Sequence, residues 1–132
     1  MLSLVGVWSV AALGGAQDSS DEVLIFLPDG SGRLEFWNWQ LSALEYFNWE
    51  QLNAERLNLR GMQAYQMNEA GQIVEEEPML DLIGGIFEIG EEESSDGLMR
   101  YVLRVNLGPA FANVYAYESN DLAAWAQPRW PE

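Results

Sequence analysis

Apolar and polar side chains alternate in short segments along most of the chain, and this period of two restricts its fold more than any other feature. Successive side chains of a β-strand point to opposite faces of a sheet, whereas an amphipathic helix repeats its apolar residues about every 3.6 positions. Leu98 to Leu107 is the longest alternating run, and no run of comparable length has the helical period. The chain is therefore predicted to be all-β.

Turn signals divide the alternating segments into about eight or nine predicted strands. The clearest is Pro28-Asp29-Gly30-Ser31-Gly32, where proline presets φ and glycine accepts positive φ, so an antiparallel hairpin is expected. Ala11 to Ser20 is expected to be a loop, and Pro78 to Gly85 interrupts the pattern and leaves room for one helical turn. Short sequential hairpins favour an antiparallel up-and-down β-barrel. The predicted strands are Leu4 to Val10, Glu22 to Leu27, Arg33 to Trp39, Ala43 to Glu50, Glu55 to Gly61 with a continuation over Gln63 to Asn68, Ile73 to Glu76, Gly85 to Gly90, Leu98 to Leu107 and Phe111 to Tyr117.

The composition of the 132-residue chain fits one packed domain over residues 1–132 and removes much of the usual catalytic chemistry. There is no cysteine and no histidine, and all six basic residues are arginine. Disulfides, histidine bases and lysine Schiff bases are therefore excluded, and we expect no cofactor. We expect a cytoplasmic monomer, although the apolar segment Met1 to Ala16 leaves a signal peptide open, despite its lack of a basic start.

The segment Leu4-Val5-Gly6-Val7-Trp8 resembles the glycine-x-tryptophan motif near the first strand of lipocalins, fatty-acid-binding proteins and small bacterial lipocalin-like (calycin) proteins. The hairpin at 28–32 and the order of the predicted strands are also similar to these proteins. The resemblance implies a lipocalin-like barrel of about eight or nine strands, in which Gly6 permits close backbone approach and Trp8 plugs the closed end. It also implies a non-catalytic binding protein. Without cysteine or histidine, the chain departs from secreted lipocalins and from haem-binding relatives.

Aromatic residues are concentrated on two neighbouring predicted strands, and they are the first candidates for a ligand site. Trp37 and Trp39 share one face, opposite Leu34 and Phe36, while Phe47 and Trp49 share a face opposite Leu44 and Tyr46. One set is expected to pack the interior. The other set either lines a binding surface or lies under the C-terminal tail, which carries Trp125 and Trp130.

Arginine rows offer a second element of a ligand site. Arg56, Asn58 and Arg60 share one strand face, and Arg100 and Arg104 share another. Such rows lie either outside, paired with carboxylates, or inside, around an anionic head group. The predicted ligand-binding residues are Trp37, Trp39, Tyr46, Phe47, Trp49, Arg100, Tyr101 and Arg104, although alternation forbids Tyr101 and the two arginines from facing inward together.

Glu69 to Asp96 contains ten acidic residues and no basic one, within a formal net charge of −15. Binding to nucleic acid or to an anionic membrane is therefore not expected. The acidic segment is either a solvated face or a surface for a cationic partner, as in immunity proteins that neutralise basic toxins, and its spacing does not fit a Ca²⁺ loop. The predicted partner-binding residues are Glu75, Glu76, Glu77, Asp81, Glu91, Glu92, Glu93 and Asp96.

The leading functional hypothesis is a non-catalytic, lipocalin-like binding protein, whose barrel either accepts a small apolar ligand or is plugged by its own side chains. The alternative is an acidic, immunity-type protein that neutralises a basic toxin or other cationic protein. An enzyme is not expected, because the sequence has no nucleophile motif, phosphate loop or metal-ligand spacing. Paired carboxylates such as Glu45 and Glu88 are the remaining acid–base candidates.

Overall fold

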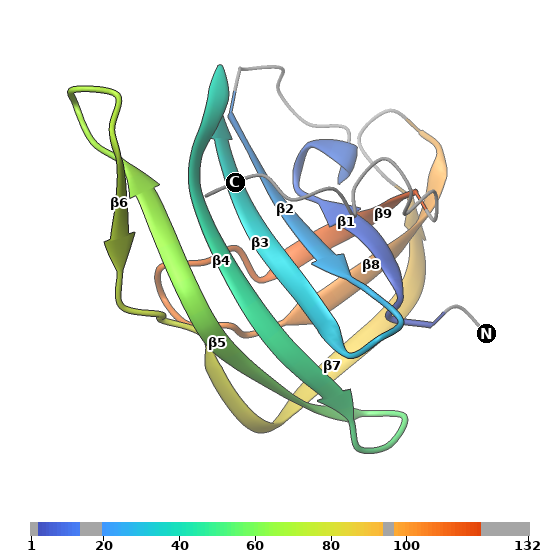
Figure 1. Ribbon diagram of the computed structural model, residues 1–132. Helices are drawn as coiled ribbons and strands as arrows, with labels where there is room; N and C mark the ends of the chain where they lie inside the picture. The colour runs from blue at the N-terminus through green and yellow to red at the C-terminus, as the bar shows by residue number, and fades with distance from the viewer. Residues whose placement is uncertain (1–2, 14–19, 94–96, 120–132) are drawn as a thin grey trace.

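The computed structural model describes residues 3–13, 20–93 and 97–119. Within these ranges the chain forms nine antiparallel strands and one short 3-10 helix (Figure 1). The elements are β1 Gly6–Ser9, η1 Ala11–Leu13, β2 Ser20–Phe26, β3 Ser31–Asn38, β4 Gln40–Gln51, β5 Arg56–Met67, β6 Ile73–Glu76, β7 Asp81–Glu93, β8 Met99–Val105 and β9 Val114–Ser119.

The sheet closes in a ring. Eight strands follow one another in the order β1-β2-β3-β4-β5-β7-β8-β9, and β9 pairs with β1. β6 pairs with β5 and lies outside this ring. The predicted all-β antiparallel class is therefore confirmed, and consecutive strands pair with each other except where β6 is bypassed.

The hairpin between β2 and β3 forms where the turn signal predicts it. The Leu27 N–H donates to the Ser31 carbonyl at 2.9 Å, and Gly30 adopts a φ of 89° that favours glycine. Gly32 allows a close approach, because a Cβ there would lie 2.3 Å from the Ile25 carbonyl oxygen and 2.5 Å from the Phe47 ring. Substitution of Gly32 would therefore displace Phe47 from the core.

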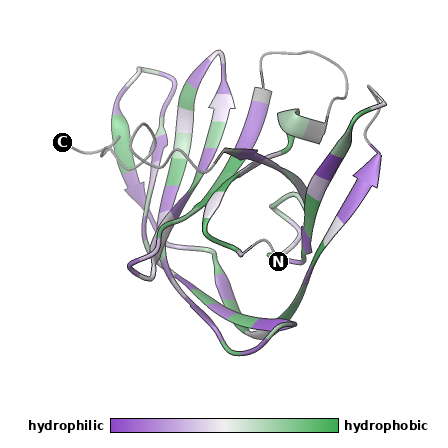
Figure 2. Cartoon of the chain, turned by 90° about the vertical axis from the view of Figure 1, so that its right-hand side faces the viewer, coloured by the Kyte–Doolittle hydropathy of each residue, from purple (hydrophilic) through white to green (hydrophobic). Residues whose placement is uncertain are grey.

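The interior of the ring is filled by apolar side chains. Trp8 is fully buried, as the sequence predicts, and its indole Nε1–H donates to the Leu4 carbonyl at 2.9 Å. Hydrophobic and hydrophilic residues alternate along the strands in Figure 2. The fully buried side chains of this core include Leu4, Trp8, Leu24, Phe26, Leu34, Phe47, Leu57, Leu59, Leu103 and Tyr115.

Two sequence predictions about local structure are wrong. Pro78 to Gly85 does not hold a helical turn, because β7 begins at Asp81 and pairs with β5. The Arg56 guanidinium donates to the Gly84 carbonyl at 2.7 Å and the Asn58 side chain accepts from the Gly84 N–H at 2.7 Å, so side chains of β5 hold this irregular part of β7. Residues 11–13, predicted as loop, form η1, where the Ala12 N–H donates to the Ser9 hydroxyl at 3.0 Å.

Candidate functional site

A cavity of about 380 Å³, here called the Tyr101 pocket, lies at one margin of the ring. The segment before β1, the end of β4, the β4–β5 turn, β7 and β8 contribute to its wall. Its described lining is mostly apolar and comprises Ser3, Leu4, Gln51, Ala54, Phe87, Ile89 and Tyr101. Leu4 and Phe87 are buried members of the core, so the floor of the pocket is the packed interior.

Tyr101 provides the pocket with a polar group. It shares a strand face with Leu103, which is fully buried, while Tyr101 itself is 41% exposed. Its hydroxyl forms no hydrogen bond with any residue that the structure describes. The hydroxyl is therefore available to a ligand that brings a donor or an acceptor.

The other predicted ligand-binding residues are not gathered around Tyr101. Arg100 and Arg104 lie on the opposite face of β8, and Arg104 donates to the exposed Glu92 carboxylate at 2.6 and 3.1 Å. These hydrogen bonds raise the pKa of Arg104. Both arginines therefore face away from the interior, as the exterior alternative predicts.

The aromatic residues separate into an inner and an outer set. Phe47 and Trp49 pack in the core, where the Trp49 indole N–H donates to the carbonyls of Leu27 and Ser31 at 3.1 and 2.9 Å. Tyr46 lies on the outer face and packs edge-to-face against Tyr65. Trp39 is 87% exposed in the turn between β3 and β4, with a φ of 66° that is unusual for a residue other than glycine.

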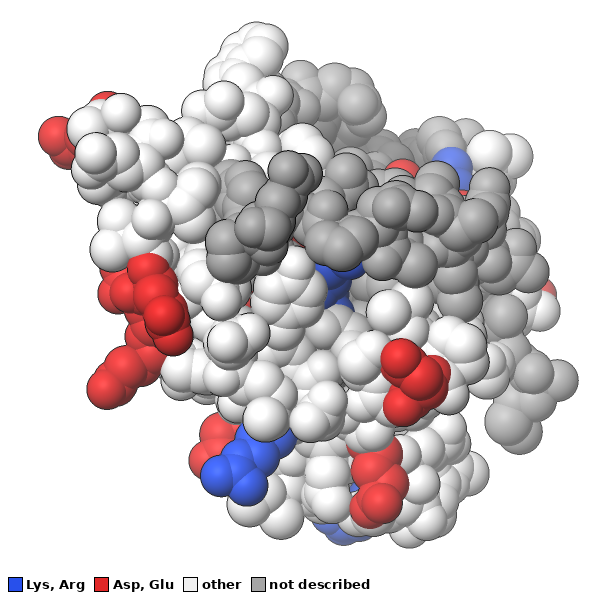
Figure 3. All heavy atoms as spheres, viewed as in Figure 1, with Lys and Arg blue, Asp and Glu red and all other residues white. Residues whose placement is uncertain are grey.

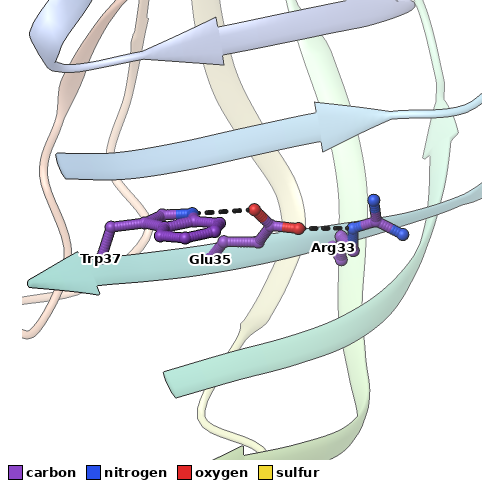
Figure 4. Close-up of polar contacts among 3 residues, drawn as sticks. All are labelled: Arg33, Glu35 and Trp37. Carbon is purple, nitrogen blue, oxygen red and sulfur yellow. Dashed lines mark hydrogen bonds and ion pairs between the residues drawn. The ribbon is translucent and has the colours of Figure 1, made fainter. Parts of the chain in front are cut away.

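A row of polar side chains on the outer face of β3 was missed by sequence reasoning. The Arg33 Nε–H donates to Glu35 at 2.7 Å, and the Trp37 indole N–H donates to the same carboxylate at 2.9 Å (Figure 4). Arg33 is 3% exposed and Glu35 is fully buried. The Nη2 of Arg33 is buried and has no hydrogen-bond partner among the residues that the structure describes. This row is a charged structural element rather than a pocket.

The signal that predicts burial of this outer row lies in the neighbouring strand. Val23-Leu24-Ile25-Phe26 is apolar without alternation, which is typical of a strand that is buried on both faces. Leu24 and Phe26 join the interior core, whereas Val23 and Ile25 form a second cluster with Val7. Arg33 pairs with Ile25 in the register and therefore shares this outer cluster's face.

A half-buried carboxylate, that of Glu22, lies on the inner face beside the β8–β9 connection. The Glu22 carboxylate accepts hydrogen bonds from the Tyr115 hydroxyl and from the Ala112 N–H. Burial raises the pKa of Glu22, and the Tyr115 hydrogen bond opposes this only in part. Burial, and then the hydrogen bond to Glu22, raise the pKa of Tyr115, so its hydroxyl remains a donor.

The predicted partner-binding acids do not form one surface. Glu75, Glu76 and Glu77 are exposed at β6, and the acidic spheres gather at the left edge of Figure 3, with further acidic groups elsewhere on that face. Glu91, Glu92 and Glu93 lie at the far end of β7, and Asp81 lies at its start. Asp96 lies outside the described residues, as do Trp125 and Trp130 of the tail.

The two carboxylates considered for acid–base chemistry lie on different faces. Glu45 pairs with Leu34 on the inner face and is 5% exposed, whereas Glu88 is exposed opposite Arg104. Within residues 3–13, 20–93 and 97–119, no group of three or more acidic, histidine or cysteine side chains is placed to hold a metal ion. No helix in these ranges has the length and apolar character needed to cross a bilayer.

No protein-family model matches the chain, and no curated protein or solved structure matches it at a significant level. Its function is therefore argued from the pockets and surfaces themselves.

Replacement of Glu35 by alanine is expected to reduce the free energy of unfolding by about 3–5 kcal/mol, because Arg33 would remain buried without its counter-charge. The double variant Arg33→Leu, Glu35→Leu is expected to lose clearly less free energy of unfolding, because neither buried charge remains. Urea unfolding followed by tryptophan fluorescence measures both. Glu92→Ala is the control. It breaks the exposed ion pair with Arg104, and its free energy of unfolding should stay close to that of the wild-type protein. A Glu35→Ala variant as stable as this control would contradict the assignment.

The raised pKa of Glu22 predicts a specific dependence of stability on pH. Between the ordinary pKa of 4.5 and the raised value in the folded protein, the folded state binds more protons than the unfolded state, so the contribution of Glu22 to stability falls as pH rises. Glu22→Gln removes this titration and keeps an acceptor oxygen for Tyr115. The wild-type protein should therefore gain stability relative to Glu22→Gln when urea unfolding is repeated at pH 5 instead of pH 7. The prediction would be refuted if the difference in free energy of unfolding between the two proteins were the same at pH 5 and pH 7.

Proposed function

We propose that this chain is a non-catalytic binding protein with a lipocalin-like barrel, and that a small apolar ligand occupies the Tyr101 pocket. The observation that carries the proposal is a cavity of about 380 Å³ whose described lining is mostly apolar and includes the Tyr101 hydroxyl. Small-molecule sites typically have volumes of about 300–1,000 Å³ and combine an apolar wall with few polar groups.

The filled interior determines where such a ligand is accommodated. Trp8, Phe26 and Phe47 occupy the space inside the ring together with the other core side chains. These side chains fill the barrel, as one of the two alternatives expects, and the ligand is therefore proposed at the margin, above Leu4 and Phe87. The buried floor offers apolar contact area without requiring the core to open.

Two features support the lipocalin-like part of the proposal. Eight antiparallel strands form the ring almost in sequence order, which is the arrangement of an up-and-down barrel. Gly6 has a φ of 145°, and Trp8, two residues later, is fully buried on the inner face. Both observations agree with the roles that the glycine-x-tryptophan resemblance implies.

An uncharged apolar dye, N-phenyl-1-naphthylamine, is expected to bind one site per chain with increased fluorescence. Ala54→Trp places a large ring at the margin of the Tyr101 pocket and should weaken binding by about tenfold or more, equivalent to about 1.4 kcal/mol. Ala70→Trp introduces the same side chain at an exposed alanine of the β5–β6 turn, which does not line the pocket, and should leave binding unchanged. Dye titration measures the affinity. Absence of dye binding, or equal affinity of the two variants, would refute the pocket assignment.

A second candidate function is binding of a cationic protein segment along β6. All four residues of β6 are exposed, and β5 is the strand that pairs with it in the described part of the chain. The opposite edge of β6 therefore presents backbone groups to which an extended segment could add as a strand. Glu75 and Glu76 on β6, followed by Glu77, favour a basic segment.

A nine-residue arginine peptide is expected to bind the chain at low salt and to lose affinity as the salt concentration rises. The triple variant Glu75→Gln, Glu76→Gln, Glu77→Gln should bind at least about tenfold more weakly. The control removes the same formal charge at exposed positions elsewhere, with Glu50→Gln, Glu55→Gln and Glu91→Gln. Calorimetric titration compares the variants. Equal weakening of both would show a response to net charge alone and would exclude a site on β6.

A further inference from the structure

A second cavity, here called the Phe111 pocket, lies among β3, β4, β5, β6 and the β8–β9 connection. Its volume is about 220 Å³. Among the described residues, none that lines the Tyr101 pocket lines this one, so a ligand of the Phe111 pocket is independent of a ligand at Tyr101. Glu76 and Glu77 are shared with the acidic surface of β6. Its wall combines aromatic rings with carboxylates.

The aromatic part of the wall is a stacked pair. The rings of Phe36 and Phe111 have centroids 5.9 Å apart and are inclined by 28°. Phe36 projects from β3 toward the core, and Phe111 comes from the β8–β9 connection, where its N–H donates to the Gly108 carbonyl at 3.2 Å. The neighbouring Ala112 N–H is bound by Glu22 at 2.9 Å. These contacts fix the position of the Phe111 ring before a ligand arrives.

The charged part of the wall is acidic. Glu45 is 5% exposed, and its carboxylate accepts from the Met79 N–H at 3.0 Å and from the Leu80 N–H at 2.7 Å. These backbone donors satisfy part of the carboxylate but bring no positive charge. Glu76 and Glu77 are exposed and complete the wall, and none of the described lining residues is basic.

We infer that the Phe111 pocket binds a small organic ammonium ion. A quaternary ammonium group is attracted by the face of an aromatic ring and by carboxylates, and it needs no directed hydrogen bonds. The wall offers both kinds of group around one cavity. An anion would be repelled by Glu45, Glu76 and Glu77, whereas a neutral apolar molecule would gain nothing from these three carboxylates.

The shape of the site favours an organic cation over a metal ion. A hard metal ion requires several oxygen ligands in a compact shell, and no such group of acidic side chains occurs in the described ranges. The volume of about 220 Å³ corresponds to about seven water molecules at roughly 30 Å³ each. A trimethylammonium group with a short substituent has a comparable size.

Choline and 3,3-dimethyl-1-butanol distinguish charge recognition from simple cavity filling, because the two molecules have nearly the same shape and only choline is charged. Choline is expected to bind with a dissociation constant on the order of 1 mM at low salt, as befits a ligand of about seven heavy atoms. The neutral alcohol should bind at least about tenfold more weakly. NMR titration of the full chain measures both affinities and shows whether the shifts centre on Phe36 and Phe111. No choline binding, equal affinity for the alcohol, or shifts centred elsewhere would overturn the inference.

Two variants test the wall. Phe111→Leu retains an apolar side chain but removes the ring, and it should weaken choline binding by about threefold to tenfold. Glu76→Gln with Glu77→Gln changes only exposed side chains and should weaken it by a similar factor, so a folding defect in the first variant does not decide the result. The matched control is Glu50→Gln with Glu91→Gln, which removes the same charge away from the pocket and should leave the affinity within about twofold. An equal loss of choline affinity in the two double glutamate variants would overturn the assignment of the site.

Discussion

The pairing of β4 with β5 is the constraint on which the rest of the structure depends. It extends from Ala43 to Gln51, with one shift of register between Tyr46 and Phe47, and it joins the two halves of the sheet into a ring. Without it, β4 and β5 would each present an open edge, and the apolar inner face would have no enclosed volume to fill. Closure thus makes the interior a packed core around Trp8, and the Tyr101 and Phe111 pockets lie outside this core.

β5 also determines where the Phe111 pocket lies. Its first part, Arg56–Arg60, pairs with β7 and continues the ring, whereas Ala64–Met67 pairs with β6 outside it. The connection from β6 to β7 must therefore return toward the ring, and Glu45 binds its backbone at Met79 and Leu80. The same carboxylate that anchors this return lines the Phe111 pocket, so the cavity is a consequence of the route that the chain takes.

The periodicity of the sequence predicts the strand pattern well because period-two alternation is a local property. It places Leu103 and Arg104 on opposite faces, and Phe47 with Trp49 on one face, as the structure has them. It fails over Pro78 to Gly85, where Arg56 and Asn58 from another strand hold Gly84 in place. It also does not predict the Tyr101 and Phe111 pockets, because each gathers residues from several strands whose register no single segment specifies.

The buried Arg33–Glu35 pair shows why alternation alone gives an incomplete account of the outer face. Polar residues opposite an apolar inner face are ordinarily solvated, yet Glu35 is fully buried beside the cluster of Val7, Val23 and Ile25. Burial of an ion pair is favourable only when hydrogen bonds replace the lost water, and Glu35 receives them from Arg33 and from the Trp37 indole. Arg33 and Trp37 each lie two residues from Glu35 on the same strand, so all three side chains share the outer face. The period of two that directs apolar side chains to the interior thus also brings these polar groups together.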